Sequence, residues 1–334
     1  MVALPTSSAS DDRDESEVVD DPSAAEELSA GPAVRETLEA RLKRRALQLL
    51  VLATLAALLY TAVQAWRIRS EGLRQREVVA ALEEAGFVIE ERSAPSVGWM
   101  ADLFGREFFT SPTAVTTRGP VDDAAASRLS ELPTLEKVNL SGAQIGDATL
   151  ANLAGLKELN ALYLADTYAS DKGIILLAAL PRLERLDLTR TQVKGPGLET
   201  VAKLPSLRSL WLDGTTLDAD APTRLSASPS LVYLSLKSTG VRGQSLASLE
   251  KIKTLQSLYL DENQLTDADI AYLSEARQLT NTLSLYGAPI GDDSVENLGK
   301  FSSLKTLSLE QTRLTPEGLA MLQRILKETR ILYP

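Results

Sequence analysis

The chain has 334 residues, a formal net charge of −10, and neither histidine nor cysteine. These absences exclude a Ser-His-Asp triad, a cysteine nucleophile, a histidine-based zinc site and any disulfide bond. The acidic excess disfavours nonspecific binding to nucleic acid, so we expect no nucleic-acid partner. The charge is unevenly distributed, with a net −9 over residues 1–40 and +7 over residues 41–76.

Residues 1–40 are predicted to form a disordered acidic tail. They are rich in small and acidic residues and poor in apolar ones, which prevents a buried core. A solvated spacer is the simplest interpretation, and a docking or modification segment is the alternative. The candidate modification sites are Ser7, Ser8, Ser10 and Ser16.

Residues 41–70 are predicted to contain a single transmembrane helix with basic flanks. The run at 46–66 has no charged residue, and a helix of this length spans roughly 31 Å, enough for the hydrocarbon core. Basic residues are denser just before the run, which favours a cytoplasmic N-terminus with the remaining chain outside. A signal sequence cleaved after Ala65 is the alternative, although its leader would be unusually long and acidic.

Residues 71–110 are predicted to form a small α/β N-terminal cap. Residues 71–86 have a helical pattern that Gly86 ends, and Phe87 begins a short strand. Aromatic and apolar residues follow, namely Trp99, Met100, Leu103, Phe104, Phe108 and Phe109. The first unit of a repeat array exposes an apolar end that must be covered. We therefore interpret these residues as a cap, with an exposed membrane-surface or ligand patch as the alternative.

Residues 111–334 consist mainly of one repeated pattern. Eight copies, spaced by 24 or 25 residues, begin at Leu135, Leu159, Leu183, Leu207, Leu231, Leu255, Leu279 and Leu304. A period of this length indicates a repeat array. Each copy begins with strand-like alternation and continues with apolar residues three apart, as in a short helix or 3₁₀ turn. A degraded ninth copy is predicted at 111–134, with Ala114 and Thr116 in strand positions, and the last helix is expected to run past residue 326.

The copies resemble leucine-rich repeats of the pattern LxxLxLxx(N/T/C)x(L/V/I). The copy at Leu279 fits only if one residue is inserted, which places Leu283 and Leu285 in the core positions. The ladder position, often asparagine in the family, is occupied by Ala143, Thr167, Thr191, Thr215, Thr239, Asn263, Ala288 and Thr312. A hydroxyl or amide there can satisfy backbone groups at the bend after the strand. The length and the threonines resemble the cysteine-containing and GALA subclasses, as in many bacterial membrane-anchored repeat proteins.

The resemblance implies an α/β solenoid of about nine repeats with a C-terminal cap. The family's form is a right-handed horseshoe with a parallel β-sheet on the concave side and short helices on the convex side. Its usual role is noncovalent protein–protein recognition, and it implies no cofactor.

Single aspartates recur just before the predicted outer helices, at Asp147, Asp171, Asp267 and Asp292. Repeated carboxylates can line a calcium site. However, each copy supplies only one, and aspartate is a preferred N-cap residue. We therefore predict helix caps and no metal site.

The candidate partner-binding surface is the concave face. Strand residues between the core leucines point away from the core. The candidates on this face are Tyr163, Asp187, Trp211, Asp213, Tyr233, Lys237, Tyr259, Asp261 and Tyr286. Strands lie about 4.8 Å apart, which places Tyr233 diagonally between Trp211 and Tyr259. Aromatic residues with a charged rim are typical of protein-binding surfaces, although aromatic residues also favour strands for packing reasons alone.

These features predict a membrane-anchored binding module that is not an enzyme and recognises a protein partner through its concave face. No pair of Asp, Glu, Lys, Tyr or Ser residues has the spacing of an active site. Two alternatives stay open. One is a substrate-receptor-like adaptor of a ubiquitin ligase, although no segment resembles an F-box. The other is a purely structural cell-envelope protein.

Overall fold

The computed structural model describes residues 32–93 and 110–333. The chain divides into two compact units, Met1–Arg67 and Ile68–Pro334. Most of the predicted acidic tail and the predicted aromatic part of the cap, from Trp99 to Phe109, lie outside the described residues. The four-part division of the chain therefore stays a prediction.

One continuous helix, α2 (Pro32–Glu84), extends over 53 residues. The sequence predicted two helical segments there, at 41–70 and 71–86. The structure joins them because no proline interrupts the pattern between them, and an isolated glycine such as Gly72 costs only about 1 kcal/mol in a helix. The helix ends at Glu84, two residues before the predicted stop at Gly86, whose φ of 97° lies in the region that glycine adopts without strain.

The apolar part of α2 meets the criteria for a membrane-spanning helix in length and composition. Within residues 40–84, an 18-residue window has a mean hydropathy of 2.1, and none of that window is buried within the protein. A core helix of a water-soluble domain would bury such a surface. A signal sequence meets the same two criteria, so membrane anchoring is taken up below as a proposal.

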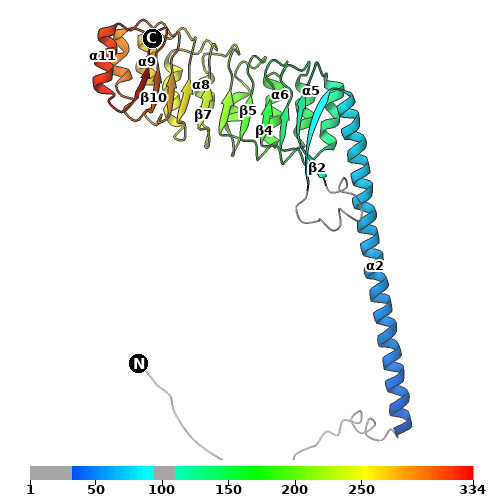
Figure 1. Ribbon diagram of the computed structural model, residues 1–334. Helices are drawn as coiled ribbons and strands as arrows, with labels where there is room; N and C mark the ends of the chain where they lie inside the picture. Colours follow the sequence, from blue (N-terminus) through cyan, green and yellow to red (C-terminus); the bar gives the residue numbers. More distant parts are fainter. Residues whose placement is uncertain (1–31, 94–109, 334) are drawn as a thin grey trace, which may run out of the picture. The chain divides into compact units, whose positions relative to one another are not determined.

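The described strands form one eleven-stranded sheet in chain order (Figure 1). The first pair, β1 and β2, is antiparallel, and every later pair is parallel. The strands are β1 (Phe87–Ser93), β2 (Thr110–Thr117), β3 (Lys137–Asn139), β4 (Ala161–Tyr163), β5 (Arg185–Asp187), β6 (Ser209–Trp211), β7 (Tyr233–Ser235), β8 (Ser257–Tyr259), β9 (Thr282–Ser284), β10 (Thr306–Ser308) and β11 (Arg330–Leu332).

Short helical segments return the chain between successive strands of the repeats (Figure 1). They are α4 (Asp123–Ala126), η2 (Ser127–Glu131), α5 (Asp147–Leu153), α6 (Asp171–Leu176), η3 (Leu177–Ala179), α7 (Leu198–Ala202), α8 (Ala221–Leu225), η4 (Gln244–Lys251), α9 (Asp267–Leu273), η5 (Asp292–Ser294), α10 (Val295–Leu298) and α11 (Pro316–Ile325), where η marks a 3₁₀ helix. The strand-and-helix solenoid implied by the repeat pattern is therefore confirmed.

The strand register follows the sequence period. Leu210 pairs with Leu186 on one side and with Leu234 on the other, and all three are fully buried. The copy that begins at Leu279 keeps this register through its extra residue, because Leu283 pairs with Leu258. Burying a leucine completely contributes roughly 1.5–3 kcal/mol, so stacking these rows is the main source of stability.

The expectation for the degraded copy at 111–134 was wrong by one residue. Val115, rather than Ala114 or Thr116, pairs with Val138 and is fully buried. A shift of one residue moves every side chain of a strand to the other face. The valine decides the register because it buries more apolar surface than alanine or threonine.

Both ends of the repeat array are covered by the chain itself. Val78 and Leu82 of α2, together with Phe87 of β1, are buried in the same apolar cluster as the leucines of the repeats. At the other end, the prediction that the last helix runs past residue 326 was wrong, because α11 ends at Ile325. The chain instead adds β11, in which Ile331 pairs with Leu307 and so continues the repeat pattern.

The ladder position acts as predicted. Thr167, for example, donates from its hydroxyl to the carbonyl of Leu164, three residues earlier, at 2.7 Å. The same bond is made by Thr191, Thr215, Thr239 and Thr312. These hydroxyls give the carbonyl groups at the bend after these strands a hydrogen-bond donor.

Asn263 makes the most bonds of the ladder residues, and it links two copies. Its amide nitrogen donates to the carbonyls of Leu260 at 3.0 Å and Leu236 at 2.7 Å. Its amide oxygen accepts from the backbone N–H of Thr239 at 3.1 Å and of Gly240 at 2.8 Å. With only 1% of its surface exposed, this side chain has no water to replace those partners.

The recurring aspartates are not the helix caps that we predicted. The N-cap before Asp147 is Gly146, and the N-cap before Asp171 is Ser170. Thr266 and Gly291 precede the other two aspartates in the same way. The carboxylates reach the following copy instead, and we call these contacts the aspartate clamps.

Asp171 shows the clamp most completely. Its two oxygens accept hydrogen bonds from the backbone N–H groups of Lys194 at 2.9 Å, Gly195 at 3.1 Å and Gly197 at 2.8 Å. Asp147, Asp267 and Asp292 make the equivalent contact with one backbone N–H each. A carboxylate that accepts several N–H bonds holds the next turn of the solenoid in place without a metal ion.

The degraded copy carries the same clamp at Asp123. Its carboxylate accepts from the N–H groups of Gly146 at 3.0 Å and Thr149 at 3.1 Å. Partial burial raises the pKa of Asp123, but the hydrogen bonds from Thr149 and Gly146 outweigh it and hold that pKa below its usual value. Over residues 32–93 and 110–333, no group of three or more acidic side chains is arranged to hold a metal ion.

Candidate functional site

The sheet face opposite the core carries the predicted partner-binding residues. In β5 and β6 the middle residue is buried and its two neighbours are more exposed, because successive side chains point to opposite faces. The strands themselves hold Tyr163, Asp187, Trp211, Tyr233 and Tyr259. The other four candidates lie two residues past the end of a strand: Asp213 after β6, Lys237 after β7, Asp261 after β8 and Tyr286 after β9.

Three aromatic side chains form a continuous row, which we call the aromatic ladder: Trp211, Tyr233 and Tyr259. The ring centroids of Trp211 and Tyr233 lie 5.1 Å apart with an interplanar angle of 43°, and those of Tyr233 and Tyr259 lie 5.0 Å apart at 36°. Tyr233 pairs with Ser209 and Ser257 in the sheet, so it lies diagonal to both other rings, as predicted. Tilted pairs at this spacing contribute about 0.5–1.5 kcal/mol each beyond burial.

A lysine of the chain covers the last ring of the ladder. The ammonium of Lys237 lies 4.9 Å from the ring centroid of Tyr259 and 2.9 Å from Oδ2 of Asp261. Asp261 is buried, and its other oxygen, Oδ1, accepts from the hydroxyl of Ser284 and from the N–H of Tyr286. The carboxylate is thus held in place from the next copy while it orients the cation over the ring.

Charge and burial shift two pKa values in this group. Partial burial lowers the pKa of Lys237, but the hydrogen bond and the negative charge of Asp261, with a contribution from Asp213, raise it above its usual value. Burial is the main reason that the pKa of Tyr233 is also raised. At neutral pH the site therefore presents a fixed Lys237 ammonium and a neutral Tyr233 phenol.

Asp213 lies two repeats before Asp261 and accepts the same two kinds of hydrogen bond, from a serine hydroxyl and from a backbone N–H. Its Oδ1 accepts from the hydroxyl of Ser235 at 2.5 Å and from the N–H of Lys237 at 3.0 Å. Within the described residues, neither a hydrogen bond nor an ion pair reaches Oδ2 of Asp213. The two carboxylates are therefore held alike, but only Asp261 is paired with a cation.

Three predicted residues make no ring contact with the aromatic ladder within the described residues, although Asp187 pairs with Trp211 in the sheet. Tyr163 lies under the ammonium of Lys137, which is 5.8 Å from the ring centroid. The carboxylate of Asp187 accepts from the backbone N–H of Thr189 at 2.9 Å. In the part of the chain that the structure describes, no ring contact joins Tyr163 or Tyr286 to the ladder. The structure thus brings seven of the nine predicted residues together: the aromatic ladder, Asp213, Lys237, Asp261 and Asp187, which lies beside Trp211.

The sequence interpretation missed an ion pair at the turn after the strands. The guanidinium of Arg190 donates to both oxygens of Asp166, from Nε at 2.6 Å and from Nη2 at 2.5 Å. Both residues have positive φ, of 51° and 57°. The sequence carried a signal for the left-handed turn but not for the ion pair, because glycine occupies the same position of other copies, as at Gly142 and Gly214.

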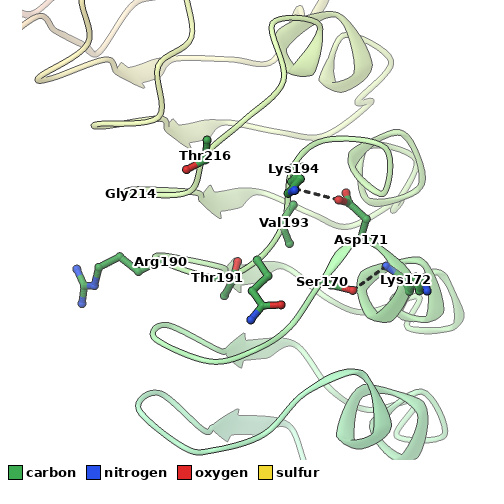
Figure 2. Close-up of a pocket in the computed structure, with 10 residues that line it drawn as sticks. Ser170, Asp171, Lys172, Arg190, Thr191, Val193, Lys194, Gly214 and Thr216 are labelled. Carbon is green, nitrogen blue, oxygen red and sulfur yellow. Dashed lines mark hydrogen bonds between the residues drawn. The ribbon is translucent and has the colours of Figure 1, made fainter.

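A groove beside this ion pair was also missed. It has a volume of about 770 Å³ and lies between the turns and the outer helices (Figure 2). The lining residues are Ser170, Asp171, Lys172, Arg190, Thr191, Gln192, Val193, Lys194, Gly214 and Thr216. In Figure 2 the carboxylate of Asp171 is occupied by the backbone N–H of Lys194 rather than directed into the groove. The groove is the space around an aspartate clamp, and its polar groups are largely used by the fold.

Comparisons with known proteins found one matching family model and a set of similar solved structures. Residues 131–154 match a family model described as a leucine-rich repeat, and no curated protein matches the sequence. Internalin C2 of Listeria monocytogenes is 20% identical, with a TM-score of 0.45, over 70% of this chain and 83% of that one. Internalin F of the same organism is 19% identical, with a TM-score of 0.36, over 66% and 86%. PEPR1 bound to AtPEP1 is 21% identical, with a TM-score of 0.48, over 79% of this chain and 41% of that one.

Proposed function

We propose that this leucine-rich repeat protein is a noncovalent binding module that recognises a protein partner through its open sheet face. The observation that supports this most is the aromatic ladder of Trp211, Tyr233 and Tyr259, which lies partly exposed on that face. Hot spots of protein interfaces are enriched in tryptophan and tyrosine, and charged groups commonly surround them. Asp213, Lys237 and Asp261 supply those charges, whereas nucleic acid would require a basic surface.

The proposal is tested by removing both ends of the ladder in the full-length chain. Trp211→Ala combined with Tyr259→Ala is expected to abolish capture of the partner by crosslinking in cells that express the protein. The thermal unfolding midpoint should fall by only several degrees, because two ring contacts are lost but both side chains lie outside the leucine core. Loss of a hot-spot pair commonly costs 2 kcal/mol or more per residue, about 30-fold in affinity for each.

A matched control removes two tyrosines that are exposed elsewhere. Tyr168 and Tyr272 have 58% and 41% of their surface exposed and are not part of the ladder. Tyr168→Ala with Tyr272→Ala should leave capture intact. Capture that survives the ladder variant, or that both double variants weaken equally, would reject the sheet face as the binding surface.

The anchor is the second part of the proposal: the apolar part of α2 holds the module in a membrane as a single span, with the N-terminus cytoplasmic and the repeats outside. It is supported by the exposed apolar surface within residues 40–84. Alkaline carbonate extraction should leave the full-length chain in the membrane pellet, and protease added to intact cells should degrade the repeats. A soluble fragment that begins after Ala65 would instead identify a cleaved signal sequence.

A further inference from the structure

Repetition within the chain provides an internal template for a binding site. In the copy that begins at Leu255, the ring of Tyr259 and the carboxylate of Asp261 hold the ammonium of Lys237, which comes from the preceding copy. Three positions define this arrangement. The aromatic residue is the fifth of its copy, the carboxylate is the seventh, and the cation is the seventh residue of the copy before.

The copy that begins at Leu207 has the same arrangement without the cation. Trp211 is its fifth residue and Asp213 its seventh, and Asp213 is held by hydrogen bonds from the next copy just as Asp261 is. The seventh residue of the copy before is Thr189, which cannot supply a positive charge. Oδ2 of Asp213 is therefore equivalent in position to Oδ2 of Asp261, the oxygen that binds Lys237.

Three cations of the described residues lie near this place, and none is bonded to Asp213. Lys237 is bonded to Asp261, although Asp213 also raises the pKa of Lys237. Arg190 donates through Nε and Nη2 to Asp166, although the negative charges of Asp187 and Asp213 add to that of Asp166 in raising its pKa. Arg185 is exposed, and it makes no ring contact with Trp211 within the described residues. Trp211 therefore presents a partly exposed indole beside the Oδ2 of Asp213, to which no cation of the described residues is bonded.

We propose that Trp211 and Asp213 bind a lysine side chain of the polypeptide partner. The ammonium of this lysine would lie over the indole of Trp211 and bond to Oδ2 of Asp213. Lys237 is placed in the same way over Tyr259 and against Asp261, two copies further along the chain. Tryptophan is the strongest cation–π partner, and a carboxylate beside it adds a charged hydrogen bond. This inference rests on the proposed function, because it specifies what the sheet face recognises.

Fluorescence of Trp211 provides a direct test in the full-length chain. The chain has three tryptophans, so Trp66→Phe with Trp99→Phe makes Trp211 the only one. The probe is the capped peptide Gly-Gly-Lys-Gly-Gly, compared with the same peptide carrying norleucine or arginine in place of lysine. We expect the lysine peptide to bind about tenfold more tightly than the norleucine peptide, the size of a partly desolvated cation–π contact.

Two substitutions test the assignment from opposite directions. Asp213→Asn keeps an oxygen for the bonds from Ser235 and Lys237 but removes the charge, and it should weaken the lysine peptide about tenfold. Asp218→Asn, an equal charge change on an exposed residue of the same copy, should not. Thr189→Lys should fill the site from within and block the lysine peptide, whereas Thr189→Met should not.

The possible results separate this inference from the proposed function. Equal binding of the lysine and norleucine peptides, or undiminished binding to Thr189→Lys, would overturn the lysine site. Tighter binding of the arginine peptide would also overturn it, as would lysine binding that appears only after Arg185→Gln. If partner capture still requires Trp211 in any of these cases, the sheet face stands as the binding surface and only the lysine assignment fails.

Discussion

Replacing Asn263 with alanine is expected to lower the free energy of unfolding of the repeat array by about 2–4 kcal/mol. The side chain satisfies two carbonyls and two N–H groups of the backbone, which belong to two adjacent copies. Leaving a buried backbone group without a partner costs about 1–3 kcal/mol, and water reaches this position poorly because only 1% of the residue is exposed. Urea denaturation of the full-length chain in detergent, followed by circular dichroism, measures the change.

Thr167→Ala is the matched control for this prediction. Thr167 occupies the same ladder position and is also buried, but its side chain makes one hydrogen bond, to the carbonyl of Leu164. Its loss should cost about 1 kcal/mol. If Asn263→Ala cost no more than Thr167→Ala, the link between the two copies would contribute nothing to stability.

Gly173→Ala is expected to destabilise the array by about 1–3 kcal/mol, although alanine is normally the better helix former by about 1 kcal/mol. Gly173 lies in the first turn of α6, directly beside the aspartate clamp of the previous copy. A Cβ there would overlap the carboxylate of Asp147 and would lie 3.0 Å from a methyl carbon of Leu150. Because the clamp is also bonded to Ser170, the carboxylate cannot move away without losing those bonds.

Two comparisons isolate this steric cause. Gly155→Ala places a Cβ no closer than 3.9 Å to any neighbour, so it should be nearly neutral. In a chain that already carries Asp147→Ala, Gly173→Ala should cost less, because its main obstacle is gone. If Gly173→Ala instead stabilised the protein, as at an open helical position, the close approach of the clamp would be refuted.

The repeats of the fold could be predicted because the period fixes their geometry. One leucine every 24 residues places each strand beside the previous copy, and even the extra residue before Leu283 could be anticipated from the pattern. The predictions from sequence failed where the repeat pattern is weak, or where the hydrogen-bond partners of a residue belong to another copy. The strand at 111–134 offered only small or polar residues around Val115, so its face was ambiguous. The role of Asp171 depends on backbone groups in the next copy, which the sequence of one repeat does not indicate.

The candidate site could be predicted to a similar extent. The spacing of adjacent strands was sufficient to place Tyr233 between Trp211 and Tyr259, because their positions in the repeat are fixed. The pairing of Lys237 with Asp261 could not be predicted, since it depends on the rotamers of two flexible side chains after the strands. Tyr163 and Tyr286 were included for their residue type and row alone, and they lie outside the ladder.

Photo-crosslinking from position 211 in intact cells tests the central claim most directly. A benzophenone amino acid in place of Trp211 should attach one discrete protein, and the same amino acid at Tyr272, on the outer helix α9, should not attach it. Equal labelling from both positions, or no protein attached from position 211, would contradict recognition through the open sheet face.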